Sequence, residues 1–138
     1  MRRKKILISV FLAAVVVLVL LIFLPARPSA ALNKLEQNQV TSADISYAEG
    51  YYTVTDEDDL RQLVEFLQSM KLRPCIPKDL DGGFGTVTIW EESRQTTIFV
   101  SESYIKINHM SFRPDRNYCD ALRKIFSELE EHCEVHRQ

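Results

Sequence analysis

The pattern of hydrophobic and polar positions divides the chain into two parts. Residues 6–24 form an apolar run in which Ser9 is the only polar residue, and Pro25 follows it. As a helix this run would be about 28 Å long, close to the roughly 30 Å hydrocarbon core of a bilayer. From residue 44 onward, apolar residues recur instead at the short periods of amphipathic strands and helices. The pattern predicts one transmembrane helix followed by one small globular domain.

The charges around the apolar run predict its orientation. Four cations occupy residues 2–5, and no carboxylate occurs before Glu36. The positive-inside rule therefore predicts a cytoplasmic tail at 1–5, a signal anchor at 6–24 and an extracytoplasmic domain. The alternative is a cleaved signal peptide and a secreted domain, because residues 29–31 (Ser-Ala-Ala) offer the small side chains of a cleavage site. The run exceeds the usual length of a signal-peptide core, about 7–15 residues, which favours the anchor.

The segment after the apolar run is rich in proline and polar residues. We interpret residues 25–41 as a linker that holds the domain away from the membrane, and residues 42–138 as the domain itself. The domain begins with two short alternating segments, 44–48 and 51–54. With Glu49-Gly50 as the turn between them, they predict a β-hairpin.

Two amphipathic helices are predicted in the domain. The first places apolar residues at the spacing of one buried face: Leu60, Leu63, Val64, Leu67 and Met70. Thr55 with Asp58 resembles a capping box at its start, and Pro74 forces its end. The second helix runs from about Asp115 to Glu131. Its predicted buried residues are Tyr118, Leu122, Ile125, Phe126 and Leu129.

Residues 86–108 predict a three-stranded antiparallel meander with two-residue turns at Ser93-Arg94 and Glu102-Ser103. These turns set aliphatic residues opposite one another on one face: Val87 with Val100, Ile89 with Ile98, Val100 with Ile105, and Ile98 with Ile107. Residues 109–114 are expected to form a loop. The predicted fold class is α+β, with an antiparallel sheet, made of the hairpin and the meander, packed by two helices on its aliphatic face.

Four groups of residues link the chain to a known kind of protein. They are Thr53-Val54-Thr55-Asp56, then Leu60, Leu63 and Leu67, then Tyr104-Ile105-Lys106-Ile107-Asn108, and finally Tyr118, Leu122 and Leu129. In these residues and in its layout the chain resembles small membrane-anchored or secreted ectodomains of unknown function from Gram-positive bacteria. The resemblance implies a place in the bacterial cell envelope. It brings no functional residue with it.

The charge of the chain is distributed unevenly. Five of the 17 cations and none of the 19 carboxylates lie in residues 1–32, so the remaining 12 cations leave the domain a net charge of −7. A domain of this charge repels phosphate backbones and anionic lipid headgroups. We therefore expect no nucleic-acid partner.

Aromatic residues provide the leading candidate for a binding surface. With the aliphatic residues of the meander turned inward, Trp90, Phe99 and Tyr104 share the opposite face of the sheet, and the predicted register lets Trp90 touch Phe99. Tyr51 and Tyr52 would extend this face. An open face of this kind predicts a binding or interaction module for an envelope protein or a cell-wall ligand. The alternative is a second small core, covered by the hairpin, the linker or the 73–85 loop.

Two weaker patterns suggest metal ligands. Glu128, His132 and His136 recur at helical spacing, with Cys133 beside them, which would let them share a metal ion; the alternative is a solvated helix end. The segment Asp79-Leu80-Asp81-Gly82-Gly83 resembles the start of a calcium loop, but an Asp-Gly turn explains the same residues. We expect no cofactor.

Catalytic residue types occur without a supporting context. His109, Ser111 and Asp115 lie close in sequence, but no strand–turn–helix motif places them together, so we expect no enzyme. The cysteines Cys119 and Cys133 are predicted on one helix, too far apart for a disulfide. Either Cys75 bridges to one of them or, as we favour, all three remain thiols.

Overall fold

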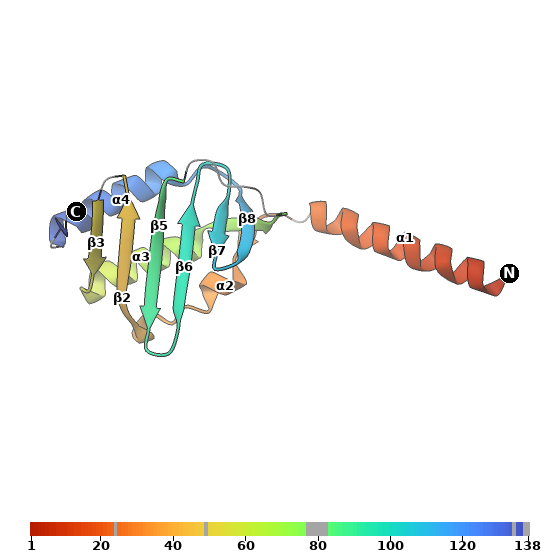
Figure 1. The fold of residues 1–138 in the computed structure, drawn as a ribbon, viewed down its shortest axis with the longest axis horizontal. Coiled ribbons are helices and arrows are strands. Elements are labelled where there is room, and N and C mark those ends of the chain that lie inside the picture. Colours follow the sequence, from red (N-terminus) through yellow and green to blue (C-terminus); the bar gives the residue numbers. More distant parts are fainter. Residues whose placement is uncertain (24, 49, 77–82, 134, 137–138) are drawn as a thin grey trace.

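The computed structural model describes residues 1–23, 25–48, 50–76, 83–133 and 135–136. It shows one long N-terminal helix followed along the chain by an α+β domain (Figure 1). This helix, α1 (Arg2–Phe23), reaches a mean hydropathy of 3.4 over 18 residues, and none of that stretch is buried. It is long and apolar enough to cross a membrane. None of its residues is buried, whereas the core helix of a globular protein is mostly buried.

The domain is built on one antiparallel sheet with nine strands in the described part of the chain. From one edge to the other the strands are β1 (Arg27–Pro28), β4 (Lys71–Pro74), β8 (Met110–Pro114), β7 (Ile105–Ile107), β6 (Gln95–Val100), β5 (Gly85–Glu91), β2 (Val40–Tyr47), β3 (Gly50–Val54) and β9 (Val135–His136). The strands β5 to β8 follow one another as a meander. The first hairpin, β2–β3, extends the same sheet and does not cover either face.

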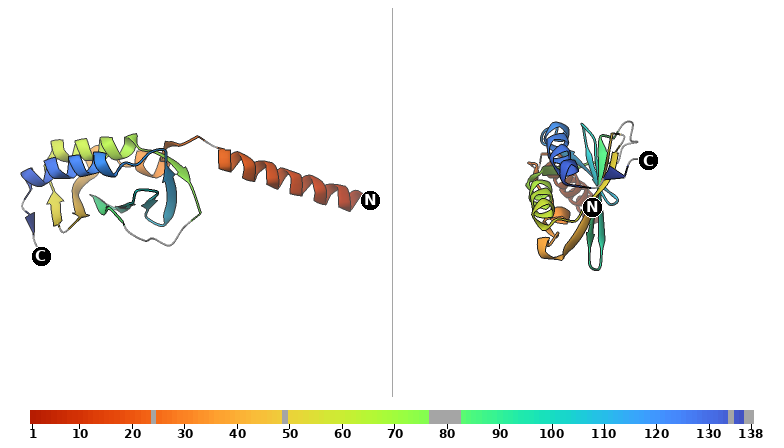
Figure 2. Two further views of the ribbon diagram at one scale, coloured as in Figure 1. Left: turned by 90° about the horizontal axis from the view of Figure 1, so that it is seen from above. Right: turned by 90° about the vertical axis from the view of Figure 1, so that its left-hand side faces the viewer.

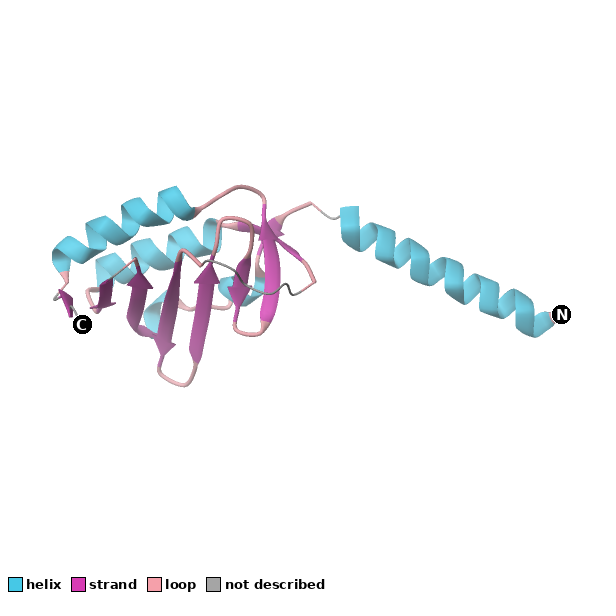
Figure 3. Ribbon diagram, turned by 45° about the horizontal axis from the view of Figure 1, so that its top comes forward, coloured by secondary structure: helices cyan, strands magenta, loops and turns pink. Residues whose placement is uncertain are grey.

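The described helices of the domain lie on one face of this sheet, which we call the inner face (Figures 2 and 3). They are α2 (Ala30–Asn33), the short 3-10 helix η1 (Gln37–Gln39), α3 (Glu57–Ser69) and α4 (Cys119–His132). Their apolar faces meet the alternating aliphatic residues of the strands in one core. We call the opposite side of the sheet the outer face; no described helix lies on it.

Both predicted helices form, but α4 begins at Cys119 rather than near Asp115, and Ile125 is only partly buried, whereas the other predicted core residues of the two helices are buried. The start of α3 also needs a small correction. The N-cap is Asp56 rather than Thr55, because Oδ1 of Asp56 accepts the backbone N–H groups of Asp58 and Asp59 at 3.0 and 3.1 Å. A short carboxylate in this position satisfies two free amides of the first turn and also complements the helix dipole.

The predicted register between β5 and β6 is wrong by two residues. Val87 is opposite Ile98, not Val100, so the turn lies at Glu92-Ser93. An ion pair between Arg94 and Glu91 closes the turn at this position, and the Glu91 side chain is only 1% exposed. A shift of two residues keeps every side chain on its predicted face, which is why the inward-facing set was nevertheless correct. The predicted pairing of β6 with β7 is confirmed.

The meander has a fourth strand where the sequence predicts a loop. The strand β8 pairs with β7 on one side and β4 on the other. A tight turn makes this possible, since Asn108 adopts a positive φ of 53° and its side-chain oxygen accepts the N–H of Thr97 at 3.0 Å. Phe112 then enters the core at 6% exposure.

The predicted linker packs on the domain for most of its length. Leu32 is fully buried and Leu35 is 4% exposed, both in the same core as α3. The side-chain amide of Gln68 donates to the carbonyls of Leu32 and Leu35 at 3.1 and 3.0 Å. Because β1 also pairs with β4, only residues 24–26 separate α1 from the sheet.

Candidate functional site

The structure places Trp90 on the outer face, where it is 39% exposed, and fixes its orientation. The indole Nε1–H donates to Oδ2 of Asp44 on the neighbouring strand β2 at 2.7 Å. The other oxygen of this carboxylate accepts the hydroxyl of Thr53 at 2.7 Å. Asp44 therefore joins three strands through their outward side chains and holds the indole against the sheet.

The predicted contact between Trp90 and Phe99 is not formed. In the observed register Trp90 is opposite Gln95, and Phe99 lies four residues further along β6, a displacement of about 13 Å along the strand. The ring of Phe99 is partly covered by Gly83, where a Cβ would lie 2.0 Å from Cζ of Phe99. The predicted alternative, in which the 73–85 loop covers the aromatic face, is therefore observed at Phe99. The three aromatic residues do not form one continuous exposed row.

Of the two tyrosines that were expected to extend the aromatic face, only Tyr51 lies on the outer side, at 41% exposure. Tyr52 is fully buried in the core, and its hydroxyl donates to the carbonyl oxygen of Phe126 in α4 at 2.7 Å. Burial also raises the pKa of Tyr52 above its usual value. Tyr52 is therefore a structural residue that joins the sheet to α4.

The helical spacing behind the predicted metal site breaks down at the end of α4. The helix stops at His132, and His136 belongs to β9, which pairs with β3. Nδ1 of His132 lies 3.2 Å from Oδ2 of Asp59 instead, beside the first turn of α3. Within the described residues no three His, Cys, Asp or Glu side chains, Glu128 included, gather as metal ligands. The calcium-loop candidates Asp79 and Asp81 lie outside those residues.

The residue types considered for catalysis are not brought together. His109 is exposed in the turn between β7 and β8, and Asp115 accepts a hydrogen bond from the Tyr118 hydroxyl at the start of α4. No hydrogen bond connects His109, Ser111 and Asp115 among the contacts of the described chain. The three cysteines are free thiols, and burial raises the pKa of Cys119 and Cys133.

The outer face carries a group of cations near one edge that the sequence analysis did not single out. Arg73 on β4 is directly opposite Arg113 on β8. Two residues before Arg113 on β8, Ser111 is opposite Lys106 on β7. Their neighbours Leu72, Phe112 and Ile105 are buried in the core, so strand alternation turns these three cations outward. We call Arg73, Lys106 and Arg113 the basic cluster.

The basic cluster lacks acidic partners. Among the described residues, no carboxylate forms an ion pair with Arg73, Lys106 or Arg113. The Nε atom of Arg73 is buried and has no hydrogen-bond partner in the same part of the chain. Like charges directly opposite one another on neighbouring strands destabilise a sheet. An anion bound between the guanidinium groups would remove this repulsion and satisfy their donors.

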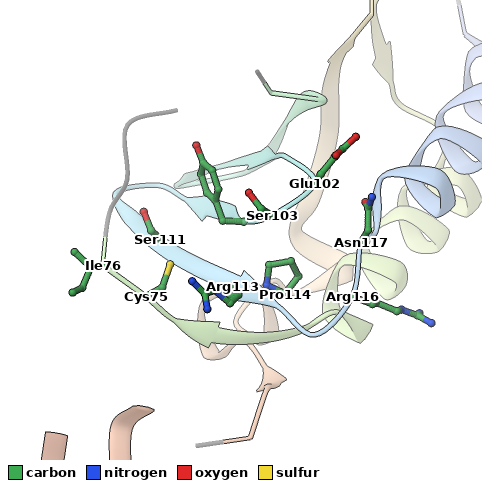
Figure 4. A pocket seen from close by; sticks show the side chains of 10 residues that line it. Cys75, Ile76, Glu102, Ser103, Ser111, Arg113, Pro114, Arg116 and Asn117 are labelled. Carbon is green, nitrogen blue, oxygen red and sulfur yellow. The ribbon is translucent and has the colours of Figure 1, made fainter. Parts of the chain in front are cut away.

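A hollow of about 360 Å³ adjoins the basic cluster (Figure 4). Arg113 lines it together with side chains that donate and accept hydrogen bonds: Ser103, Tyr104, Ser111 and Asn117. The other charged residues at its wall are Glu102 and Arg116, and Cys75 borders it at the end of β4. Cations and hydroxyl groups around one cavity suit the binding of an anionic group.

The position of the cluster could not be read from sequence, because β4 and β8 are short strands rich in arginine and proline. Only their pairing sets Arg73 beside Arg113. The signal that was available is local charge, since residues 104–116 contain three cations but a single carboxylate, Asp115. No protein-family model, curated protein or solved structure matches the chain, so the site rests on its own geometry.

Proposed function

We propose that the protein is a single-pass, membrane-anchored binding module whose domain lies outside the cytoplasm and recognises an anionic component of the cell envelope. The observation that carries the proposal is the combination of an apolar helix with no buried residue and an outer sheet face whose basic cluster has no ion partner in the described chain. The cytoplasmic side is assigned to the N-terminus by the cations at residues 2–5.

The folded segment that follows α1 supports a retained anchor over a cleaved signal peptide. Cleavage after residues 29–31 would cut within α2 and remove β1, which pairs with β4. It would also separate Ser29, which is buried, from the core that Leu32 enters. A signal peptidase would have to bind residues 29–31 in extended form, but in the structure these residues are part of the folded domain.

The open face of the sheet is the natural binding surface of such a module. The predicted aromatic row does not form, but Trp90 on β5 and Tyr51 on β3 remain exposed at one side of the face, and the basic cluster and its hollow occupy the other side. Charged and hydroxyl side chains around the hollow favour an anionic partner over an apolar one. We therefore propose that the envelope partner binds through its negative charge and not through contact with an aromatic row.

A topology experiment tests the proposal. The full chain is expressed in a bacterium with one epitope at its N-terminus and another at its C-terminus, and protease is added to intact spheroplasts. We expect the C-terminal epitope to be lost while the N-terminal epitope survives on a short membrane-bound fragment. Survival of the C-terminal epitope until lysis would contradict the proposed orientation. Separation of the two epitopes before protease is added would show that the leader is cleaved.

A further inference from the structure

We infer that the basic cluster docks the domain onto the phosphate headgroups of the bilayer that α1 spans. The inference rests on the proposed function, and it adds the partner: anionic lipid of the protein's own membrane. It draws on the connection between α1 and the sheet, on cations that form no ion pair within the described residues, and on the distribution of charge over the domain.

The connection between helix and sheet brings the cluster to the membrane surface. The helix α1 ends at Phe23, and at Arg27 the chain already pairs with Leu72 of β4. Four residue steps extend over at most about 14 Å, so β4 is tied close to the headgroup layer. Figure 1 shows α1 leaving the domain on the side of β8, opposite to β3.

The cations of this edge have the chemistry that a phosphodiester requires. Arg73 and Arg113 present two guanidinium groups from directly opposite positions, and neither has an acidic partner among the described residues. A phosphate between them accepts hydrogen bonds from both and cancels their mutual repulsion. Arg27 and Lys71, which lie on the paired strands β1 and β4, add positive charge at the same edge.

Six of the acidic residues of the domain gather at the two helix ends far from α1. The first turn of α3 contains Glu57, Asp58 and Asp59, and the last turns of α4 contain Glu128, Glu130 and Glu131. These two helix ends adjoin one another, as the contact between His132 and Asp59 shows. In Figure 1 the end of α4 and β3 lie on the side away from α1. The repulsion of anionic lipid expected from the net charge of −7 is therefore strong at this end, which favours docking of the domain by the edge that carries the basic cluster.

The cysteines of the native chain provide a test without added labels. Cys75 borders the hollow beside the cluster, and Cys133 lies at the far end of α4. The full chain is reconstituted in nanodiscs of phosphatidylcholine, with and without phosphatidylglycerol, at low ionic strength. Both cysteines are alkylated with the uncharged reagent N-ethylmaleimide, and mass spectrometry measures the rate at each site. We expect alkylation of Cys75 to slow at least fivefold in the anionic discs, with Cys133 unchanged.

Charge-matched variants identify the groups responsible. The variant Arg73→Gln/Arg113→Gln removes two cations from the cluster, whereas Arg61→Gln/Lys124→Gln removes two exposed cations from the helices. Each cation near an anionic surface changes the docked population roughly fivefold, so the first variant should lose the protection of Cys75 and the second should keep it. An anionic surface also lowers the local pH, which by itself slows the alkylation of a thiol. Both variants experience the same surface pH. Protection of Cys75 that persists in Arg73→Gln/Arg113→Gln would therefore reflect pH and not docking, and would contradict the inference.

Three further outcomes decide the inference. Equal rates at Cys75 in the two kinds of disc would overturn it. Equal protection by millimolar inorganic phosphate in phosphatidylcholine discs would also overturn it, by making a soluble anion the ligand. Protection that survives 1 M salt would exclude the electrostatic contact. The topology experiment is independent of all three, because a domain on either side of the membrane remains able to dock; failure of the proposed function is therefore recognised separately.

Discussion

Arg73 and Arg113 lie directly opposite each other on the antiparallel strands β4 and β8, with both side chains on the outer face of the sheet. This arrangement costs stability in the free domain, and no carboxylate of the described chain offsets the cost. Functional sites commonly break the rules of a stable fold in this way, because the ligand supplies the missing partner. The pair therefore offers a direct test of electrostatic frustration at the candidate site.

Replacing one member of the pair by an acid should stabilise the protein. We expect Arg113→Glu to raise the free energy of unfolding by about 0.5–1 kcal/mol at low salt, because a like-charge pair becomes an opposite-charge pair. The measurement is urea denaturation of the full chain in a neutral detergent, followed by the fluorescence of Trp90, the single tryptophan.

The control for this prediction is Arg113→Lys, which keeps the charge and should leave the low-salt stability almost unchanged. High salt should shrink the difference between Arg113→Glu and the wild type, because it screens exposed charges. A loss of stability in Arg113→Glu that is the same at all salt concentrations would show that packing, not repulsion, dominates at this position.

The buried hydroxyl of Tyr52 gives a second prediction. Tyr52→Phe should lower the free energy of unfolding by about 1–2 kcal/mol, because it leaves the carbonyl of Phe126 without its 2.7 Å hydrogen bond inside the core. The neighbouring Tyr51 is 41% exposed, so Tyr51→Phe is the matched control and should change stability by less than about 0.5 kcal/mol. Equal effects of the two substitutions would contradict the structural role of the Tyr52 hydroxyl.

The stability of the protein at acid pH should depend on Glu91. Its hydrogen bond with Arg94 holds the pKa of this buried carboxyl below its ordinary value of 4.5, although burial alone would raise it. Since the folded pKa is the lower one, the stabilisation is complete above about pH 4.5 and is lost as the pH falls through the folded value.

A pH series on Glu91→Gln checks this dependence. At pH 7 the variant should be less stable by about 1–3 kcal/mol, because the Arg94 guanidinium loses its ionised partner. As the pH falls through the folded pKa of Glu91, which lies below 4.5, the difference from the wild type should shrink, because the native carboxyl then becomes neutral as well. A difference that stays constant from pH 7 to pH 3 would mean that Glu91 contributes through packing alone. The exposed neighbour Glu92, changed to Gln, serves as the control.

The sequence predicts the fold class well because strand alternation and helix periodicity report burial directly. Ile45, Val87 and Leu63 all reach the core as their patterns indicate. Register is less accessible, since a shift of two residues leaves the inner and outer faces unchanged. Here the choice depends on the ion pair of Glu91 with Arg94, which closes the turn one residue earlier than the expected Ser93-Arg94.

The candidate site depends on information that periodicity does not contain. The predicted contact of Trp90 with Phe99 required the wrong register, and the predicted metal site required α4 to continue past His132. The basic cluster arises from the pairing of β4 with β8, two strands separated by 35 residues of chain between Pro74 and Met110. Such long-range pairing follows from the packing of the whole domain and has no local signature.

The boundary between anchor and domain provides the last prediction. If residues 25–41 were a free spacer, Leu32→Ala would have no effect on the domain. In the structure Leu32 is fully buried against α3, so the substitution should lower the free energy of unfolding by about 2–4 kcal/mol through lost apolar contact and the cavity it leaves. The exposed neighbour Asn33, changed to Ala, is the matched control and should lie within about 0.5 kcal/mol of the wild type. Urea denaturation in neutral detergent distinguishes the two cases, and a neutral Leu32→Ala would restore the flexible linker and remove the short connection on which lipid docking depends.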